Sequence, residues 1–269
     1  YVLTQPTGVS ANITPAALTV QNPTAQDKLY DGNTNAVVGG TLVGVVNGDN
    51  VTLNTTGAFA SSAAGVEPVS GFSITQTGSN YSLTQPTGVT ATIGQIALTV
   101  VNPAAQGKTY DGNTNAVVSG TLAGVVNGDN ITLNTTGTFA SPAAGPEGVS
   151  GFSITQPGNN YTLTQPVGVS ANIGQIALTV VSPAAQDKPY DGNTNAVVSG
   201  TLSGVVNGDN VTLNTTGAFA SPAAGVEGVS GFSIAQPGNN YTLTQPVGVS
   251  ANIGQIALTV VNTAAQDKP

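Results

Sequence analysis

The chain has 269 residues, of which 39 % are hydrophobic and 6 % are charged, and its formal net charge is −8. It contains no Cys, His, Met, Trp or Arg. This composition excludes the common nucleophile–base pairs, the Cys and His sets that bind zinc, and a basic surface for nucleic acid. The hydrophobic content also argues against intrinsic disorder. We therefore expect a folded protein that is not an enzyme.

One sequence unit recurs along the chain at a constant spacing. The motif YDGNTNAVV begins at Tyr30, Tyr110 and Tyr190, a period of 80 residues without insertion. Residues 110–189 and 190–269 differ at only seven positions, namely 123, 131, 138, 146, 155, 182 and 183 against their partners 80 residues later. Near-identical copies suit a spacer or a multivalent binder better than a catalytic chain.

The repeat also suggests where domains begin and end. Residues 1–13 repeat the sequence that starts at Tyr81, so the chain opens in mid-repeat and this segment is expected to be the tail of a preceding repeat. The motif IGQIALTV at 93–100 reads as a strand end, a turn and a new strand. We therefore expect repeat domains over residues 17–93, 97–173 and 177–253, with 257–269 as the first strand of a following repeat. Links this short are not flexible linkers, so the domains are expected to touch and form an elongated rod.

Within each repeat, apolar and polar residues alternate as they do in half-buried strands. In the second repeat this pattern falls in the segments 97–100, 130–141, 149–155 and 160–173, separated by Gly, Pro, Asn and Asp. No segment has the apolar period and caps of a helix. The sequence predicts an all-β tandem array of small antiparallel β-sandwich-like domains. A β-grasp-like domain with one short helix is the alternative.

The segment YDGNTN contains a candidate cation site. Asp111, Asn113 and Asn115 stand at alternate positions, as do the first ligands of a calcium-binding loop. The Gly and the bidentate Glu that should follow are replaced by Ala116 and Leu122. Asp and Asn side chains also bond their own backbone in turns, and we favour this interpretation over calcium. The matching candidate ligands in the other repeats are Asp31, Asn33, Asn35, Asp191, Asn193 and Asn195.

A second polar motif, NGDN at 127–130, carries an Asn-Gly turn signal of the hairpin type. Its Asp129 could join a calcium site only if the fold brings it near Asp111. Each repeat also contains one Lys, for which two interpretations are open. Lys108 is exposed to solvent, or it forms a covalent bond with Asn160; we favour exposure.

Several separated motifs together resemble a known family. Lys108, the YDG triplet, GTLAGVVNGDNITL, GTFAS, GFSI and NYTLTQP…ANI occur in the order found in the YDG-type tandem repeat of bacterial surface proteins, including filamentous-haemagglutinin-like exoproteins. The resemblance covers nearly the whole chain and implies a secreted or surface-displayed stalk or adhesin with no catalytic residue. It marks as fold-defining turn and core residues Tyr30, Asp31, Gly32, Tyr110, Asp111, Gly112, Tyr190, Asp191, Gly192, Tyr81, Tyr161 and Tyr241.

From the composition, the repeat and this resemblance, we expect the chain to be a non-enzymatic extracellular structural protein. It would be a repeat stalk or fibre-forming segment of a bacterial surface adhesin or filament. The alternative is a multivalent module in which each repeat binds a glycan or a protein. No cofactor is expected, and calcium is the one metal considered. The expected partners are neighbouring repeats and other copies of the chain in a fibre, with a host or surface ligand as a further candidate. Neither nucleic acid nor a membrane span is expected.

Overall fold

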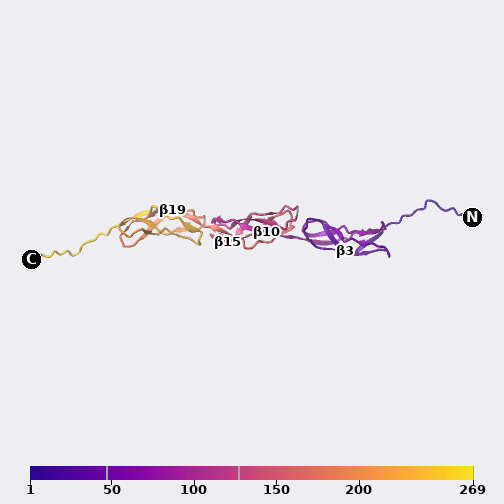
Figure 1. The fold of residues 1–269 in the computed structure, drawn as a ribbon, viewed down its shortest axis with the longest axis horizontal. Coiled ribbons are helices and arrows are strands. Elements are labelled where there is room, and N and C mark those ends of the chain that lie inside the picture. Colours follow the sequence, from indigo (N-terminus) through magenta and orange to yellow (C-terminus); the bar gives the residue numbers. More distant parts are fainter. Residues whose placement is uncertain (47, 127, 207, 269) are drawn as a thin grey trace. The chain divides into compact units, whose positions relative to one another are not determined.

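The computed structural model describes residues 1–46, 48–126, 128–206 and 208–268, and all regular structure in these ranges is β-strand (Figure 1). The first repeat contains β1 (Ala16–Ala25), β2 (Lys28–Leu29), β3 (Asn35–Val43), β4 (Thr52–Leu53), β5 (Thr56–Phe59), β6 (Gly65–Ser70), β7 (Ile74–Thr75), β8 (Tyr81–Leu83) and β9 (Thr90–Gly94). The predicted all-β tandem array is confirmed. The β-grasp alternative is wrong, because it requires a helix and the described residues contain none.

The same nine strands recur in the next two repeats. The second repeat contains β10 (Ile96–Ala105), β11 (Lys108–Thr109), β12 (Asn115–Ala123), β13 (Thr132–Leu133), β14 (Thr136–Phe139), β15 (Gly145–Ser150), β16 (Ile154–Thr155), β17 (Tyr161–Leu163) and β18 (Ser170–Gly174). The third contains β19 (Ile176–Ala185), β20 (Lys188–Pro189), β21 (Asn195–Ser203), β22 (Thr212–Leu213), β23 (Thr216–Phe219), β24 (Gly225–Ser230), β25 (Ile234–Ala235), β26 (Tyr241–Leu243) and β27 (Ser250–Gly254). The described residues before β1 and after β27 carry no strand.

Each repeat forms a seven-stranded sheet and a separate two-stranded one. In the first repeat the order is β2-β9-β6-β5-β3-β1-β8, and β4 pairs with β7. The central pairs are antiparallel, whereas β1 runs parallel to β8 and β2 runs parallel to β9. The sheet is thus antiparallel in its centre, as predicted, with one parallel pair at each edge. The two parallel pairs arise because strands from the end of the repeat return beside strands from its beginning.

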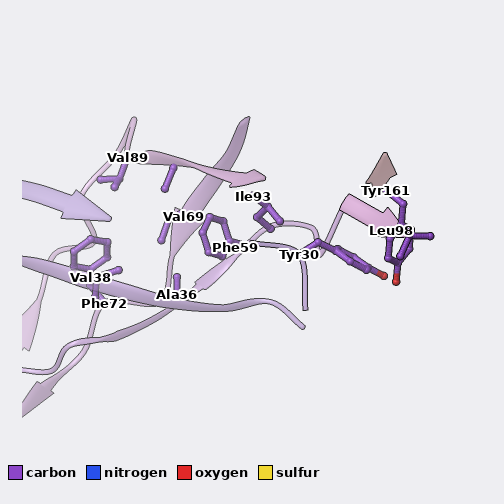
Figure 2. Close-up of a cluster of buried hydrophobic side chains, with 11 residues drawn as sticks. Tyr30, Ala36, Val38, Phe59, Val69, Phe72, Val89, Ile93, Leu98 and Tyr161 are labelled. Atoms are coloured by element: carbon purple, nitrogen blue, oxygen red, sulfur yellow. The ribbon is translucent and has the colours of Figure 1, made fainter. Parts of the chain in front are cut away.

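The sheet curls around an apolar core. Strands β1 and β9 are not neighbours in the sheet order, yet they contact each other. Alternate side chains point inward, so Ala36 and Val38 on β3 are buried while Val37 between them is half exposed. The buried cluster includes Phe59 and Ile93 (Figure 2). Each such large side chain contributes about 1.5–3 kcal/mol on burial.

The residues group into two compact units that do not follow the repeat boundaries. One unit contains Tyr1–Asn102, Gly120–Asn134 and Phe152–Pro166. The other contains Pro103–Ser119, Thr135–Gly151 and Val167–Pro269. The first unit therefore includes the passage from the first repeat to the second, and the other unit includes the passage from the second to the third. The predicted domain boundaries stay predictions, since neither unit coincides with a set of whole repeats.

Candidate functional site

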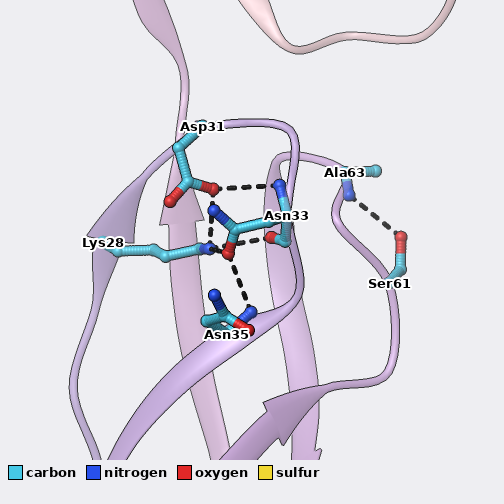
Figure 3. A network of polar contacts seen from close by, with 6 residues as sticks. All are labelled: Lys28, Asp31, Asn33, Asn35, Ser61 and Ala63. Carbon is cyan, nitrogen blue, oxygen red and sulfur yellow. Dashed lines mark hydrogen bonds and ion pairs between the residues drawn. The ribbon is translucent and has the colours of Figure 1, made fainter.

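The YDGNTN turn of the first repeat encloses a lysine ammonium group (Figure 3). Lys28 Nζ donates to Asp31 Oδ1 at 2.7 Å, to the Asn33 carbonyl oxygen at 2.7 Å and to Asn33 Oδ1 at 3.0 Å. The ammonium also lies 5.5 Å from the centre of the Phe59 ring, within the range of a cation–π contact. The same oxygens therefore surround a cation, but that cation belongs to the protein's own side chain.

The turn itself is held by side-chain to backbone bonds. Asp31 Oδ1 accepts from the Asn33 backbone N–H at 3.1 Å, and Asn33 Oδ1 accepts from the Asn35 N–H at 2.9 Å. Gly32 adopts a φ of +78°, a conformation that favours glycine. Asn35 thus enters the network through its backbone, and its side chain does not join the oxygens around Lys28.

The arrangement is repeated in the other two turns. Lys108 Nζ lies 2.6 Å from Asp111 Oδ1, and Lys188 Nζ lies 2.7 Å from Asp191 Oδ1. The hydrogen bond from Lys108 lowers the pKa of the Asp111 carboxyl below its ordinary value. Among the described residues, no group of three or more Asp or Glu side chains is close enough to hold a metal ion. Of the three side chains proposed for calcium in this repeat, those of Asp111 and Asn113 bind the lysine ammonium, and that of Asn115 does not.

The predicted exposed lysine is wrong, because only 19 % of the Lys108 side chain is accessible. The covalent alternative with Asn160 is not supported by the hydrogen bonds either. Lys108 Nζ donates to Asp111 and Asn113, whereas Asn160 Oδ1 accepts from the Ala64 backbone N–H at 2.9 Å. Lysine and asparagine therefore have separate roles.

A second cluster joins the first repeat to the second within the first compact unit. Tyr30 OH donates to Asp129 Oδ2 at 2.9 Å, and Tyr161 OH donates to the same oxygen at 2.6 Å. The two tyrosine rings meet edge to face, with centroids 5.5 Å apart. Figure 2 shows Tyr30 extending from the core of its own repeat toward Leu98 and Tyr161. Edge-to-face pairs of this kind contribute about 0.5–1.5 kcal/mol beyond burial.

Backbone and amide contacts complete this joint. The Val126 N–H donates to Tyr161 OH at 3.0 Å, and Gln95 Nε2 donates to the Asn159 carbonyl at 2.8 Å. The side chain of Gln156 pairs with both the N–H and the carbonyl of Tyr161, which fixes that tyrosine at the start of β17. The joint therefore combines apolar burial with hydrogen bonds to an ionised acceptor.

The other compact unit contains the same joint one period later. Tyr110 OH and Tyr241 OH both donate to Asp209 Oδ2, and the Tyr110 and Tyr241 rings are again 5.5 Å apart. The Ala144 N–H donates to Asn240 Oδ1 at 2.9 Å. We call Tyr30, Ala64 and their equivalents the tyrosine face, and Val126, Asp129, Asn160, Tyr161 and their equivalents the aspartate face.

The joint shifts the ionisation of its tyrosines. Burial, reinforced by the hydrogen bond to Asp129, raises the pKa of Tyr161 to about 12. Burial and the bond to Asp209 raise the pKa of Tyr241 to about 12 in the same way. The pKa of Tyr30 is also raised, chiefly by burial. The neutral phenol is the form that the joint requires, because it must donate to a carboxylate.

The structure places the residues marked as fold-defining in three settings. Tyr30 and Tyr110 are buried in the joints, whereas Tyr190 is 43 % exposed. The equivalent residues of the aspartate face, which are Tyr81, Tyr161 and Tyr241, are all buried. The Asp residues of the YDG triplets, Asp31, Asp111 and Asp191, bind lysine, and the glycines Gly32, Gly112 and Gly192 all have positive φ.

Sequence reasoning missed Asp129 as a functional residue. The Asp129 N–H donates to the Val126 carbonyl at 3.1 Å, so the segment does form a turn. It is not a hairpin, because the flanking strands β12 and β13 belong to different sheets. The first Asn of this motif in each repeat, namely Asn47, Asn127 and Asn207, lies outside the described residues. Every pair of positions keeps a constant offset in a repeat without insertions, so the sequence carried no signal that singled out the pairing of this Asp with two tyrosines.

Every buried side-chain polar atom in the described part of the chain has a hydrogen-bond partner. Three of the carboxylates that recur from repeat to repeat bind lysine or tyrosine: Asp31 accepts from Lys28, Asp49 from Tyr81 and Asp129 from Tyr30. No helix in that part is long and apolar enough to span a membrane. The recurrent polar side chains hold turns and joints.

Strands repeated at a constant period and joined by the same contacts define an all-β tandem-repeat protein. The YDG domain model matches residues 14–88, 94–168 and 175–248, so the chain belongs to the YDG-domain family. No curated protein matches the chain. Among solved structures, a tandem segment of titin is similar at 9 % identity and a TM-score of 0.24, with 89 % of this chain and 99 % of that chain covered. The fold class rests on the strands themselves.

Proposed function

We propose that this chain is a non-enzymatic structural segment, a stalk or fibre-forming part of a bacterial surface adhesin or filament. The observation that carries the proposal is the use of polar side chains present in every repeat to join one repeat to the next. Asp129 and Asp209 each accept hydrogen bonds from two tyrosines, one of which belongs to the preceding repeat. A protein selected for its length gains from joints that are identical in every copy.

The lysine-filled turns support the same role. Lys28 and its equivalents are the cations of the three repeats, and each is held by its own turn. The surface of the described residues is thus left with few cationic groups that could recognise an anionic ligand. Because neighbouring repeats bury Tyr30 and Tyr110 against the aspartate face, each joint is expected to restrict bending between repeats.

Two measurements test the proposal. Antibodies against residues 1–269 should label intact cells of the producing organism, and labelling only after permeabilisation would contradict a surface location. Small-angle scattering of the chain at low concentration should give a radius of gyration well above the roughly 18 Å expected for a compact globule of this length. A value near that of a globule would contradict a stalk.

A further inference from the structure

The Asp-Gly pairs of the chain all lie in the YDGNTN turns. No other Asp in the sequence is followed by Gly, so the pairs are Asp31-Gly32, Asp111-Gly112 and Asp191-Gly192. Three of the chain's four lysines bind the Asp side chains of these three pairs. A lysine held against an Asp-Gly pair is therefore a constant feature of the repeat.

An Asp-Gly pair is chemically labile. The backbone nitrogen of the glycine can attack the side-chain carboxyl carbon of the Asp and close a five-membered succinimide ring. A C–N bond forms, and the amide proton leaves with the carboxyl OH as water. Water then opens the ring at either carbonyl, and one of the two openings gives isoaspartate. The mass of the chain is unchanged, but its backbone now passes through the side chain and is one carbon longer.

The turn itself makes this reaction accessible. Gly112 has a φ of +77°, a conformation that favours glycine, so a larger residue that would shield the backbone nitrogen is disfavoured there. Burial does not shield the carboxyl group either, because 46 % of the Asp111 side chain is accessible. Protection against ring closure has to come from another contact.

We propose that the bound lysine protects each Asp-Gly pair from conversion to isoaspartate. Ring closure needs the neutral carboxylic acid, because the departing oxygen leaves as water. Asp111 Oδ1 accepts from Lys108 Nζ at 2.6 Å and from the Asn113 backbone N–H at 3.1 Å. Both donors favour the carboxylate over the acid, and the lysine adds its positive charge. The lysine thus keeps the carboxyl group in the form that does not react.

The charged and titratable groups around this carboxyl group support the assignment. The pKa of Asp111 is lowered, chiefly by the hydrogen bond from Lys108. The other titratable group that acts on Asp111 is Tyr110, and its hydroxyl stays neutral because burial raises its pKa. Lys108 therefore controls the protonation of Asp111.

Isomerisation would also disturb the joint between repeats. Tyr110 directly precedes Asp111, its N–H donates to the Gly174 carbonyl at 2.8 Å, and its hydroxyl donates to Asp209. An extra backbone carbon at the next residue would change the turn that holds this tyrosine in place. The protective role itself concerns the turn alone, so it does not depend on the proposed structural function.

Isoaspartate formation in a Lys108→Met variant of the full chain tests the proposal. The variant is incubated at neutral pH and physiological temperature, and peptide mapping with electron-transfer fragmentation distinguishes isoaspartate from Asp. Isoaspartate should accumulate several-fold faster at Asp111 than at Asp31 and Asp191, whose lysines remain in the same molecules. The three turns can be told apart because a different residue precedes each tyrosine, namely Leu29, Thr109 or Pro189.

The dependence on pH separates protection by charge from simple loosening of the turn. The excess at Asp111 should shrink as the pH falls below the lowered pKa of the lysine-bound carboxyl groups, since the neutral acid is then present in all three turns. Asn115→Ala is the matched control, because the Asn115 side chain does not bind the lysine, and it should leave the three turns equal.

Equal accumulation at the three turns of Lys108→Met at neutral pH would overturn the proposal. An excess at Asp111 that does not change with pH, or an equal excess in Asn115→Ala, would overturn it as well. Scattering at low concentration tests the stalk separately, because it reports the shape of the chain and not the chemistry of its turns.

Discussion

A double-mutant cycle on Tyr30 and Asp129 would measure the joint between the first two repeats. Tyr30 OH donates to Asp129 Oδ2 at 2.9 Å, and a hydrogen bond to a charged group contributes about 1.5–3 kcal/mol. We expect Tyr30→Phe to lower the free energy of unfolding by about 2 kcal/mol. Asp129→Ala should cost about 3–4 kcal/mol, because it also removes the acceptor of Tyr161. In the double variant the shared bond is lost once, so the coupling energy should be about 1.5–2 kcal/mol.

Urea unfolding of the full chain, followed by far-UV circular dichroism and analysed as coupled neighbouring repeats, would give these energies. The matched control pairs Asp129→Ala with Tyr110→Phe. Tyr110 donates to Asp209, so this second pair should be additive within about 0.5 kcal/mol. Additive effects of Tyr30→Phe and Asp129→Ala would refute the assigned joint. An equally large coupling energy in the control pair would show that the coupling does not come from direct contact between Tyr30 and Asp129.

Three further perturbations have defined outcomes. The folded-state pKa of Tyr161 is about 12, against an ordinary value of about 10, so its contribution to stability is complete below pH about 10 and is lost as the pH rises to about 12. Tyr161→Phe should therefore reduce the loss of stability at alkaline pH, measured as urea midpoints across pH. An unchanged loss would count against the joint. Lys108→Met should lower the free energy of unfolding by about 2 kcal/mol. The bond from Lys108 stabilises the folded state while Asp111 is ionised, above its ordinary pKa of 3.8, and this stabilisation is lost as the pH falls below that value. The Lys108→Met variant should therefore lose less stability in acid than the unmodified chain. An identical dependence of stability on acid pH would contradict the assigned pair. Gly200→Ala should destabilise the folded chain by about 3 kcal/mol in thermal unfolding, because the φ of Gly200 is +153° and the added carbon would lie 2.3 Å from a valine methyl group on β19. Gly228→Ala is the control, because a carbon added there has no neighbouring atom within 4 Å. Equal effects of the two substitutions would be inconsistent with the described backbone.

The fold class could be read from local pattern, but the parallel strand pairs could not. Alternation along 97–100, which lies within β10, predicts a strand because it needs only the residues of that strand. The alternation along 130–141 predicts one strand as well, but this segment contains β13 and β14, which belong to different sheets. The pairing of Ala16–Leu18 with Tyr81–Leu83 depends on the path of the whole repeat. No local signal distinguishes a parallel from an antiparallel neighbour in so short a strand.

The candidate site divides in a similar way. Asp31 and Asn33 could be assigned to a turn from their own chemistry, because their bonds reach backbone groups only two residues away. The role of Asp129 could not be derived in this manner, since its partner Tyr30 is 99 residues distant in sequence. Lys28 lies between these cases. Its partner is three residues away, yet only the folded turn shows that the ammonium lies among the oxygens.

The parallel pairing of β1 with β8 has a mechanical consequence. Because β1 and β8 are parallel, the start of β1 and the end of β8 lie at opposite ends of the ladder that joins them. Tension applied through the two chain ends would therefore pull these strands in opposite directions along their length. The ladder would be loaded in shear, so its bonds would have to rupture together instead of peeling apart one after another.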